Sequence, residues 1–363
     1  MNKISILHLL LLAMTFIGLK NHVTILPALL ENGGRDSWLA VILGAVVMIP
    51  WIFLLLFIHK QSKGEHIRNW LERRIGKRLT AILFFVTAAY LLLLAAVTMR
   101  ETLQWFNISF LPDTPPIVLL VIFSILCMTL ATMNILTITM VNSIVLFGVL
   151  VLGFFVAIVN IPIKDHTLLK PFLEHGMSPV VSSMVYAMSG YIELTLLLFL
   201  QHYIKKPLRS YHLLLILAVL AGLTLGPLIG AITEFGPKEA AELRYPAYEE
   251  WTLATIGQYF EHMDFFSAYQ WLTGAFIRVG ILLFIIVEMY KWTEQKKRIW
   301  TNLAMPFFVL CCILFFVNEE QFLIFDSGWF LIMTACFFGL LSVILFIAVL
   351  KKEKPRQGAP KHG

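Results

Sequence analysis

Ten long apolar segments, separated by short polar breaks, dominate this sequence of 363 residues. An α-helix needs about 20 mostly apolar residues to cross the roughly 30 Å of hydrocarbon in a bilayer. Hydrophobic residues make up 59% of the chain and charged residues only 14%, which excludes an ordinary soluble domain. We therefore predict an all-α integral membrane protein with ten transmembrane helices. The predicted spans cover residues 4–30, 38–58, 79–106, 117–133, 136–161, 179–203, 211–233, 265–290, 299–317 and 327–350.

The basic residues are distributed unevenly between the two ends of these spans. Twenty of the 28 lysines and arginines lie on the side of the N-terminus, and five lie on the opposite side. Because cytoplasmic loops carry the excess of positive charge, we predict that both termini are cytoplasmic. The chain then divides into a membrane domain, residues 1–350, and a basic cytoplasmic tail, residues 351–363. A net charge of +6 that is spread by membrane side argues against a nucleic-acid-binding module.

Two connections between spans are longer than the others. Residues 64–78 place apolar and charged residues at helical spacing, which predicts an amphipathic helix on the lipid of the inner leaflet. Residues 234–264, on the outer side, are rich in acidic and aromatic residues and could form either a lid or a docking surface. The sequence contains no phosphate-binding loop, nucleophile motif or metal-ligand spacing, and its four cysteines lie within spans. We expect no enzymatic activity, no metal and no cofactor.

The first span carries polar and helix-breaking residues at the depth of the membrane centre, in MTFIGLKNHVTILP at residues 14–27. Non-helical backbone at that depth persists only where protein or a water-filled cavity surrounds it. Span 6 has a similar stretch, MSGYIE at residues 188–193, and interruptions at corresponding positions of two five-span halves typify transporter binding sites. Continuous helices with packing glycines are the alternative. The residues predicted to line the site are Gly18, Lys20, Asn21, His22, Ser189, Gly190, Tyr191, Glu193 and Arg278.

Three ionisable residues, Lys20, Glu193 and Arg278, lie near the membrane centre in spans 1, 6 and 8. Charges inside a membrane are costly and usually serve a function. One acid among two bases predicts a buried ion pair of Glu193 with Lys20 or with Arg278. The other cation would then be left for an anionic ligand or for backbone carbonyls. A purely structural network is the alternative.

Three further charged residues, Arg100, Glu101 and Glu288, fall near the ends of spans 3 and 8. Long side chains at span ends reach the membrane interface at little cost. We therefore interpret these three as snorkelling side chains and assign them no part in the site.

The interruption in span 1 also indicates a class of ligand. Freed N–H groups from about Val23 onward carry the positive end of a helix dipole and would receive a carboxylate, while opened carbonyls and Glu193 would accept an ammonium. An amino acid or a similar small polar nutrient fits both. We interpret His22 as a histidine bonded to a neighbouring carbonyl rather than as a proton relay.

The run FIGLKNHVTILPALLENGGRDSWLAVILG, residues 16–44, resembles the spore germination permease family, the B subunits of the nutrient germinant receptors of Bacillus-type spores. The chain length, the ten spans and MSGYIE agree, so the resemblance covers nearly the whole chain. That family is similar to the amino acid/polyamine/organocation superfamily, which implies a LeuT-like 5+5 inverted repeat with halves near residues 1–161 and 179–350. The resemblance also implies the spore inner membrane and two partners, a larger A subunit and a lipoprotein C subunit. The chain departs from the family at residues 20–22, where smaller residues are often found.

These observations predict a germinant-sensing subunit. A nutrient would bind at the midplane between broken spans 1 and 6, with spans 3 and 8, and shift a conformational equilibrium that partner subunits read. The alternative is a proton-coupled amino-acid transporter that uses the same site with alternating access.

Overall fold

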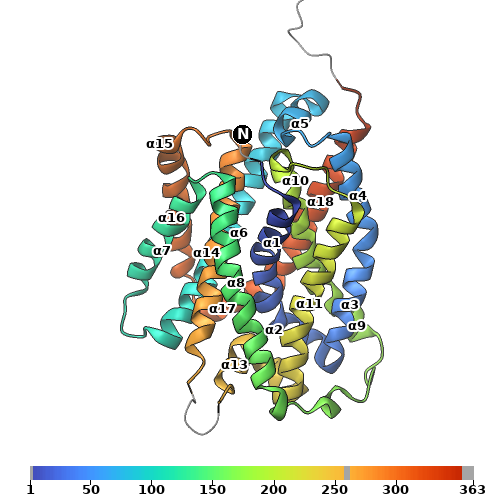
Figure 1. The fold of residues 1–363 in the computed structure, drawn as a ribbon, viewed down its shortest axis with the longest axis vertical. Coiled ribbons are helices and arrows are strands. Elements are labelled where there is room, and N and C mark those ends of the chain that lie inside the picture. Colours follow the sequence, from blue (N-terminus) through green and yellow to red (C-terminus); the bar gives the residue numbers. More distant parts are fainter. Residues whose placement is uncertain (1–2, 257–261, 354–363) are drawn as a thin grey trace, which may run out of the picture.

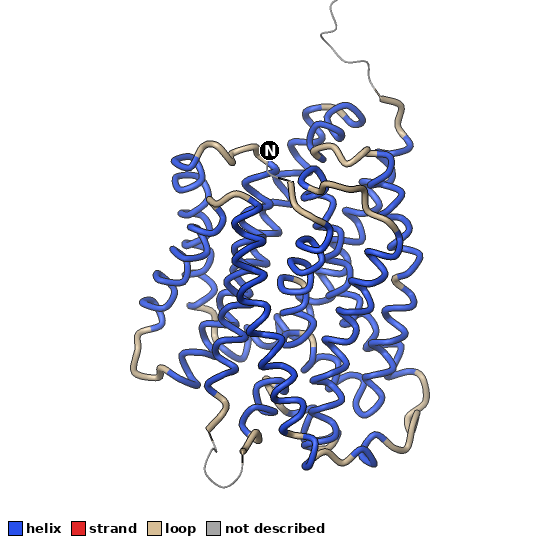
Figure 2. The backbone as a smooth tube through the Cα atoms, in the orientation of Figure 1, coloured by secondary structure: helices blue, strands red, loops and turns tan. Residues whose placement is uncertain are grey.

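The computed structural model describes residues 3–256 and 262–353, which form a bundle of helices that run roughly along a common direction (Figure 1, Figure 2). No β-strand occurs among these residues. Residues 257–261 of the predicted outer segment lie outside the described residues, as does the predicted tail from residue 354 onward. The prediction of an all-α membrane protein is confirmed.

The predicted spans correspond to helical segments of the structure. Among the described residues, nine segments are long and apolar enough to cross a membrane, and α7 (Pro116–Ala131) is a shorter apolar helix at the position of span 4. The short helices α5 (Ile67–Ile75), α12 (Pro237–Glu242) and α13 (Pro246–Thr252) lie between spans. The other helices, in span order, are α1 (Ile6–Phe16) with α2 (Leu26–Gly33), α3 (Ser37–Val47) with α4 (Ile49–Gln61), α6 (Lys77–Phe110), α8 (Ile135–Val159), α9 (Ser178–Tyr191) with α10 (Leu197–Leu200), α11 (Ser210–Phe235), α14 (Phe265–Met289), α15 (Lys296–Ile299) with α16 (Met305–Phe315), and α17 (Glu319–Ile324) with α18 (Leu331–Leu350).

Spans 1 and 6 both depart from α-helical geometry near their middle. In span 1 the π-helical segment η1 (Lys20–Thr24) joins α1 to α2, and the amide of Ile25 bonds to the carbonyl of Lys20, five residues earlier, at 3.1 Å. In span 6 the 3-10 segment η5 (Ile192–Leu196) follows α9. The interruption in span 1 occurs where it was predicted, but this span widens by a π-turn instead of unwinding after Gly18. Such turns are frequent at functional sites. In span 6, Ser189 and Gly190 still belong to α9, and the departure from α-helix begins at Ile192, near the end of the predicted stretch.

Span 1 lies in the middle of the bundle. Its first helix, α1, packs on α8, α11 and α14, and η1 contacts α9 and α11. Around the outside, large apolar side chains such as Phe85, Ile144 and Phe147 are strongly exposed. A surface of this kind is expected to face lipid. The interruption in span 1 is therefore surrounded by other helices, as non-α backbone at membrane depth requires.

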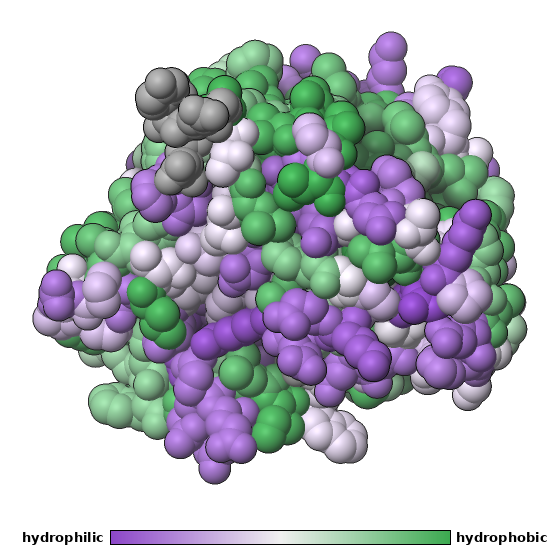
Figure 3. Space-filling model, turned by 90° about the horizontal axis from the view of Figure 1, so that it is seen from below, coloured by the Kyte–Doolittle hydropathy of each residue, from purple (hydrophilic) through white to green (hydrophobic). Residues whose placement is uncertain are grey.

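One end of the bundle carries the N-terminus, the end of α18 and the amphipathic helix α5 (Figure 1). There the amide of Ile4 donates to the carbonyl of Tyr203 at 2.8 Å, and the amide of Lys205 donates to the carbonyl of Ile4 at 3.0 Å. These bonds hold the start of span 1 against the end of span 6. The opposite end carries α12 and α13. Seen end-on in Figure 3, it has hydrophilic residues across its middle and hydrophobic residues around much of its edge.

Candidate ligand site around span 1

Lys20, in the interruption of span 1, joins an ion cluster of three residues with Glu193 and Arg278. Nζ of Lys20 lies 3.1 Å from Oε1 of Glu193, and the Arg278 guanidinium binds the two oxygens of the same carboxylate at 2.8 and 3.0 Å. The side chains of Lys20 and Arg278 are 2% exposed and that of Glu193 is 0% exposed. Two buried cations, from spans 1 and 8, therefore share one buried carboxylate from span 6.

Both of the predicted pairings with Glu193 occur together, so neither cation is left over for an anionic ligand in this conformation. Each cation also binds a carbonyl: Lys20 donates to that of Ser189 at 3.0 Å, and Arg278 donates to that of Phe16. These carbonyls lie close to the two interruptions, where the regular helical pattern is lost. The ion cluster thus supplies hydrogen bonds that hydrocarbon cannot provide.

Asn21 and Gly190 bring spans 1 and 6 into close contact. A Cβ at position 190 would lie 2.3 Å from Oδ1 of Asn21, so any side chain there would displace Asn21. Nδ2 of Asn21 donates to Thr224 of span 7 at 3.2 Å, whereas its buried Oδ1 has no hydrogen-bond partner among the described residues. The hydroxyl of Tyr191 donates to the carbonyl of Val41 in span 2 at 3.3 Å. Side chains therefore fill the space between spans 1 and 6 in which we expected a ligand.

Two acids that the sequence did not assign to the site also lie beside span 1. Glu101 of span 3 is 7% exposed and accepts a hydrogen bond from Thr24 at 3.0 Å. Asp326 lies in the π-helical segment η8 (Phe325–Phe330) of span 10, one residue before the predicted start of that span, and its buried Oδ1 lacks a partner within the described ranges. Asp326 interacts electrostatically with both Lys20 and Glu101. An acidic pair therefore lies next to the ion cluster.

The interpretation of Arg100, Glu101 and Glu288 as snorkelling side chains is wrong, because all three are buried. Helix α6 continues to Phe110, so Arg100 and Glu101 lie more than two turns inside its end. Arg100 donates at 3.0 Å to the carbonyl of Val317 in the connection between spans 9 and 10. The last residues of α6 include polar side chains that lower the local hydropathy. The predicted span therefore ended at residue 106, whereas the helix continues to Phe110.

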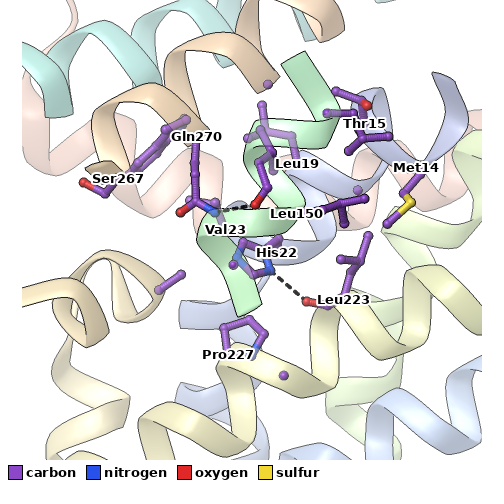
Figure 4. A pocket seen from close by; sticks show the side chains of 18 of the residues that line it. Met14, Thr15, Leu19, His22, Val23, Leu150, Leu223, Pro227, Ser267 and Gln270 are labelled. Atoms are coloured by element: carbon purple, nitrogen blue, oxygen red, sulfur yellow. Dashed lines mark hydrogen bonds between the residues drawn. The ribbon is translucent and has the colours of Figure 1, made fainter. Parts of the chain in front are cut away.

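A cavity of about 380 Å³ lies against a different face of span 1 (Figure 4). Residues of span 1, α8, α11, α14 and α13 line it. Gly18 and His22 are the only predicted site residues in this lining, and spans 3 and 6 do not contribute to it. Most of the lining is apolar, with Gly, Leu and Val the commonest residues, and in sequence such residues resemble a surface that faces lipid. In the sequence, Gly222 and Gly226, one turn apart in span 7, could have indicated a space beside this span.

His22 connects span 1 to span 7 at the wall of this cavity (Figure 4). Its Nδ1 lies 3.0 Å from the carbonyl oxygen of Leu223. A carbonyl oxygen only accepts, so in the neutral ring Nδ1 carries the proton and Nε2 keeps a lone pair. The interpretation of His22 as a histidine bonded to a neighbouring carbonyl is confirmed.

His66, His202 and Glu288, at the end of the bundle that carries the N-terminus, have the composition of a metal site. Their ligand atoms lie within 4.8 Å of one another. Nδ1 of His66 accepts the amide of Arg68 at 3.2 Å, so Nε2 carries the proton and donates to the carbonyl of Glu288 at 3.1 Å. Burial and the neighbouring His202 lower the pKa of His66 to about 4, which keeps its ring neutral near pH 7. His202 also donates from Nε2, to the Glu288 carboxylate at 3.0 Å. The two Nε2 atoms that face Glu288 both carry protons in this arrangement. It therefore fits a hydrogen-bonded group better than a metal site, in which these nitrogens would have to offer lone pairs.

Sequence comparison relates this chain to spore germination proteins. A family model described as spore germination protein matches residues 3–323. The chain is 42% identical over 343 residues to Spore germination protein XB of Bacillus anthracis, covering 93% of this chain and 96% of that protein. It is 29% identical over 320 residues to Putative spore germination protein YfkT of Bacillus subtilis (strain 168), covering 85% of each. Spore germination protein KB of the same strain is 22% identical over 282 residues, covering 75% of this chain and 74% of that protein.

Among solved structures, the crystal structure of MhsT in complex with L-phenylalanine is similar, with a TM-score of 0.59. The match covers 94% of this chain and 95% of MhsT at 13% sequence identity. MhsT has the LeuT fold. The predicted LeuT-like arrangement, with departures from α-helix in spans 1 and 6, is confirmed.

Proposed function

This chain belongs to the spore germination permease family, and on this premise we propose that it is the nutrient-sensing B subunit of a spore germinant receptor. It is a multi-pass membrane protein of the permease or receptor-subunit kind and not an enzyme. In this proposal a small nutrient binds beside span 1 and shifts a conformational equilibrium. An A subunit and a lipoprotein C subunit read that shift in the spore inner membrane, and both termini face the cytoplasm.

The observation that carries the proposal is that one short segment of span 1 contacts both the ion cluster and the cavity. Lys20 and Asn21 bind residues of spans 6 and 7, whereas Gly18 and His22 line the cavity. A ligand in the cavity would therefore touch the same turns that hold span 1 against Glu193. If the ligand favours one of two positions of span 1, it shifts the balance between them, and partner subunits can respond.

An amino acid as the nutrient remains a prediction. Span 1 passes through a π-turn directly into α2, so the N–H groups that were expected to receive its carboxylate are not freed by unwinding, and Asn21 fills the space next to Gly190 in this conformation. An amino acid would bind there only after span 1 moves away from Gly190 and Glu193. The cavity beside Gly18 and His22 is already open, and we propose it as the site that a nutrient meets first.

Gly18→Leu is expected to suppress the nutrient response while leaving the protein in the membrane. A Cβ at position 18 would lie 3.0 Å from a methyl group of Leu223, and the rest of the new side chain would occupy the cavity. In spores whose only copy of this subunit carries the change, we expect the nutrient concentration for half-maximal germination to rise about tenfold or more, equivalent to roughly 1.4 kcal/mol. Germination is followed across amino acids, sugars and nucleosides.

The matched control is Ala218→Leu, which adds bulk to an exposed position of α11 outside the cavity lining. It should respond as the unmodified protein does. An unchanged dose dependence in Gly18→Leu, with normal amounts of the subunit, would place the nutrient elsewhere.

A proton-coupled transporter is the second candidate, and the acidic pair beside span 1 favours it. Glu101 and Asp326 are buried, and intramembrane acids of this kind carry protons in many transporters. We expect the isolated chain in proteoliposomes to show no uptake of labelled amino acids under a pH gradient. Uptake that Glu101→Gln abolishes would replace the receptor function by transport.

A further inference from the structure

We propose that the cavity beside span 1 binds an uncharged, largely apolar molecule with a single hydrogen-bond donor, and that this molecule enters from the bilayer between spans 5 and 7. The inference names the ligand class of the site through which the proposed sensing acts, and it rests on that function for its biological meaning. A zwitterionic amino acid would be excluded from the cavity, so the nutrient that first meets this site would belong to the uncharged class, and an amino acid would have to bind between spans 1 and 6 instead.

The charge of the lining supports an uncharged ligand. The described residues that line the cavity include no Asp, Glu, Lys or Arg. A buried ammonium or carboxylate without a counter-charge is strongly unfavourable. The ion cluster does not help, because Lys20, Glu193 and Arg278 do not line the cavity and bind one another.

Most polar groups of the lining already have partners. Oε1 of Gln270 accepts from the indole of Trp251 at 2.9 Å, and its Nε2 donates to the carbonyl of Val149 at 2.9 Å. The hydroxyl of Thr15 donates to the carbonyl of Leu11 at 3.1 Å, and that of Ser267 donates to the carbonyl of Asp264. These groups offer a ligand little hydrogen bonding.

His22 supplies the acceptor. Because its Nδ1 donates to Leu223, the Nε2 lone pair remains, and no hydrogen bond to Nε2 occurs within the described part of the chain. A ligand hydroxyl or amide N–H would donate to this nitrogen. A polar acceptor in a largely apolar wall orients a ligand and selects one that carries a donor.

The surroundings of the cavity indicate a lateral entrance. Gly222 and Gly226 of span 7 are exposed, and a Cβ at either would meet nothing within 4 Å. Across from them Phe154 of span 5 is 68% exposed, as expected for a residue that faces lipid. On the outer side Trp251 of α13 is 3% exposed and lies over the cavity. The glycines leave the bilayer side open, whereas α13 covers the side toward water.

Photolabelling of the full chain in lipid nanodiscs tests the ligand class. The first probe is a medium-chain primary alkanol with a diazirine in its chain, and the matched probes are the carboxylate of the same length and photo-leucine, a zwitterion. We expect saturable labelling of spans 5 and 7 by the alkanol alone. Unlabelled alkanols should compete about three- to fourfold better per added methylene until the cavity is full, after which the gain stops.

Two variants and one control locate the binding. Gly222→Leu, at the proposed entrance, should reduce the rate and extent of alkanol labelling, whereas Ala218→Leu, one turn away on an exposed surface, should not. His22→Phe keeps an aromatic ring but removes the acceptor, so it should abolish the preference for the alkanol over its methyl ether.

Three results would overturn the proposal. The first is labelling of the lining by photo-leucine or the carboxylate at the level of the alkanol. The second is equal labelling of Gly222→Leu and Ala218→Leu. The third is equally efficient labelling by a diazirine in a phospholipid acyl chain, which would make the cavity a place for bulk lipid. Saturable alkanol binding together with an unchanged germination response in Gly18→Leu would support the ligand class and remove the sensing role, so the two failures are distinguishable.

Discussion

Replacing Glu193 by glutamine is expected to lower the free energy of unfolding by about 3 to 5 kcal/mol, because it leaves two buried cations without their shared anion. Lys20 and Arg278 bind this carboxylate at 2.8 to 3.1 Å, and all three side chains are buried. Chemical denaturation of the purified chain in detergent micelles measures the change. We also expect the variant to accumulate poorly in the membrane.

Glu174→Gln is the matched control, since Glu174 pairs with Arg35 at 2.6 Å on the surface and its side chain is 48% exposed. An exposed pair contributes about 0 to 1 kcal/mol. Adding Lys20→Met to Glu193→Gln should recover part of the loss, because one uncompensated charge is then removed. Equal small effects of Glu193→Gln and Glu174→Gln would show that the ion cluster does not stabilise the fold.

Gly190→Ala is expected to destabilise the contact between spans 1 and 6 by about 1 to 3 kcal/mol, the usual cost of inserting an atom into a closely packed interior. The new Cβ would lie 2.3 Å from Oδ1 and 2.8 Å from Cγ of Asn21. Thermal unfolding of the purified chain measures the loss, and nutrient-triggered germination reports any effect on sensing.

A second change at Asn21 separates this contact from a general effect of alanine. Asn21→Ala removes the amide that the new Cβ would meet, so the double variant should be less destabilised than the sum of the two single variants. Gly222→Ala, whose Cβ would meet nothing within 4 Å, should change stability by no more than about 0.5 kcal/mol. If the double variant shows simple additivity, Gly190 and Asn21 are not in the contact described.

The spans could be predicted from sequence because hydrocarbon requires about 20 apolar residues per crossing. The interruptions could be predicted because few segments place residues such as Lys20 and Asn21 at membrane depth. The kind of interruption could not, since a π-turn and an unwound segment have the same composition. Likewise, the position of each residue along its span predicted that Lys20, Glu193 and Arg278 lie at the same membrane depth. It did not predict that both cations bind the same carboxylate.

The cavity could not be predicted from sequence for a different reason. Residues such as Val149 and Phe154 are equally suited to lipid, to another helix or to an empty space, because all three are apolar environments. Only the three-dimensional separation of spans 5 and 7 distinguishes them. Gly18 does line an open space, but that space lies toward spans 5 and 7 and not toward span 6, where the ligand was predicted.

The ion cluster also constrains how the protein is made. Lys20 leaves the ribosome 173 residues before Glu193, which takes roughly 9 to 35 s at about 5 to 20 residues per second. Throughout that interval the nascent first span holds a cation with no acid to bind, at a cost of about 2.5 to 3.5 kcal/mol at the membrane centre. Glu101 of span 3 emerges earlier but accepts a hydrogen bond from Thr24, and Arg100 pairs with Glu319, which emerges later still, so Glu193 is the acid that first binds Lys20. A nascent chain released before span 6 would carry an unneutralised first span into the bilayer, and such products should be the ones that membrane proteases remove.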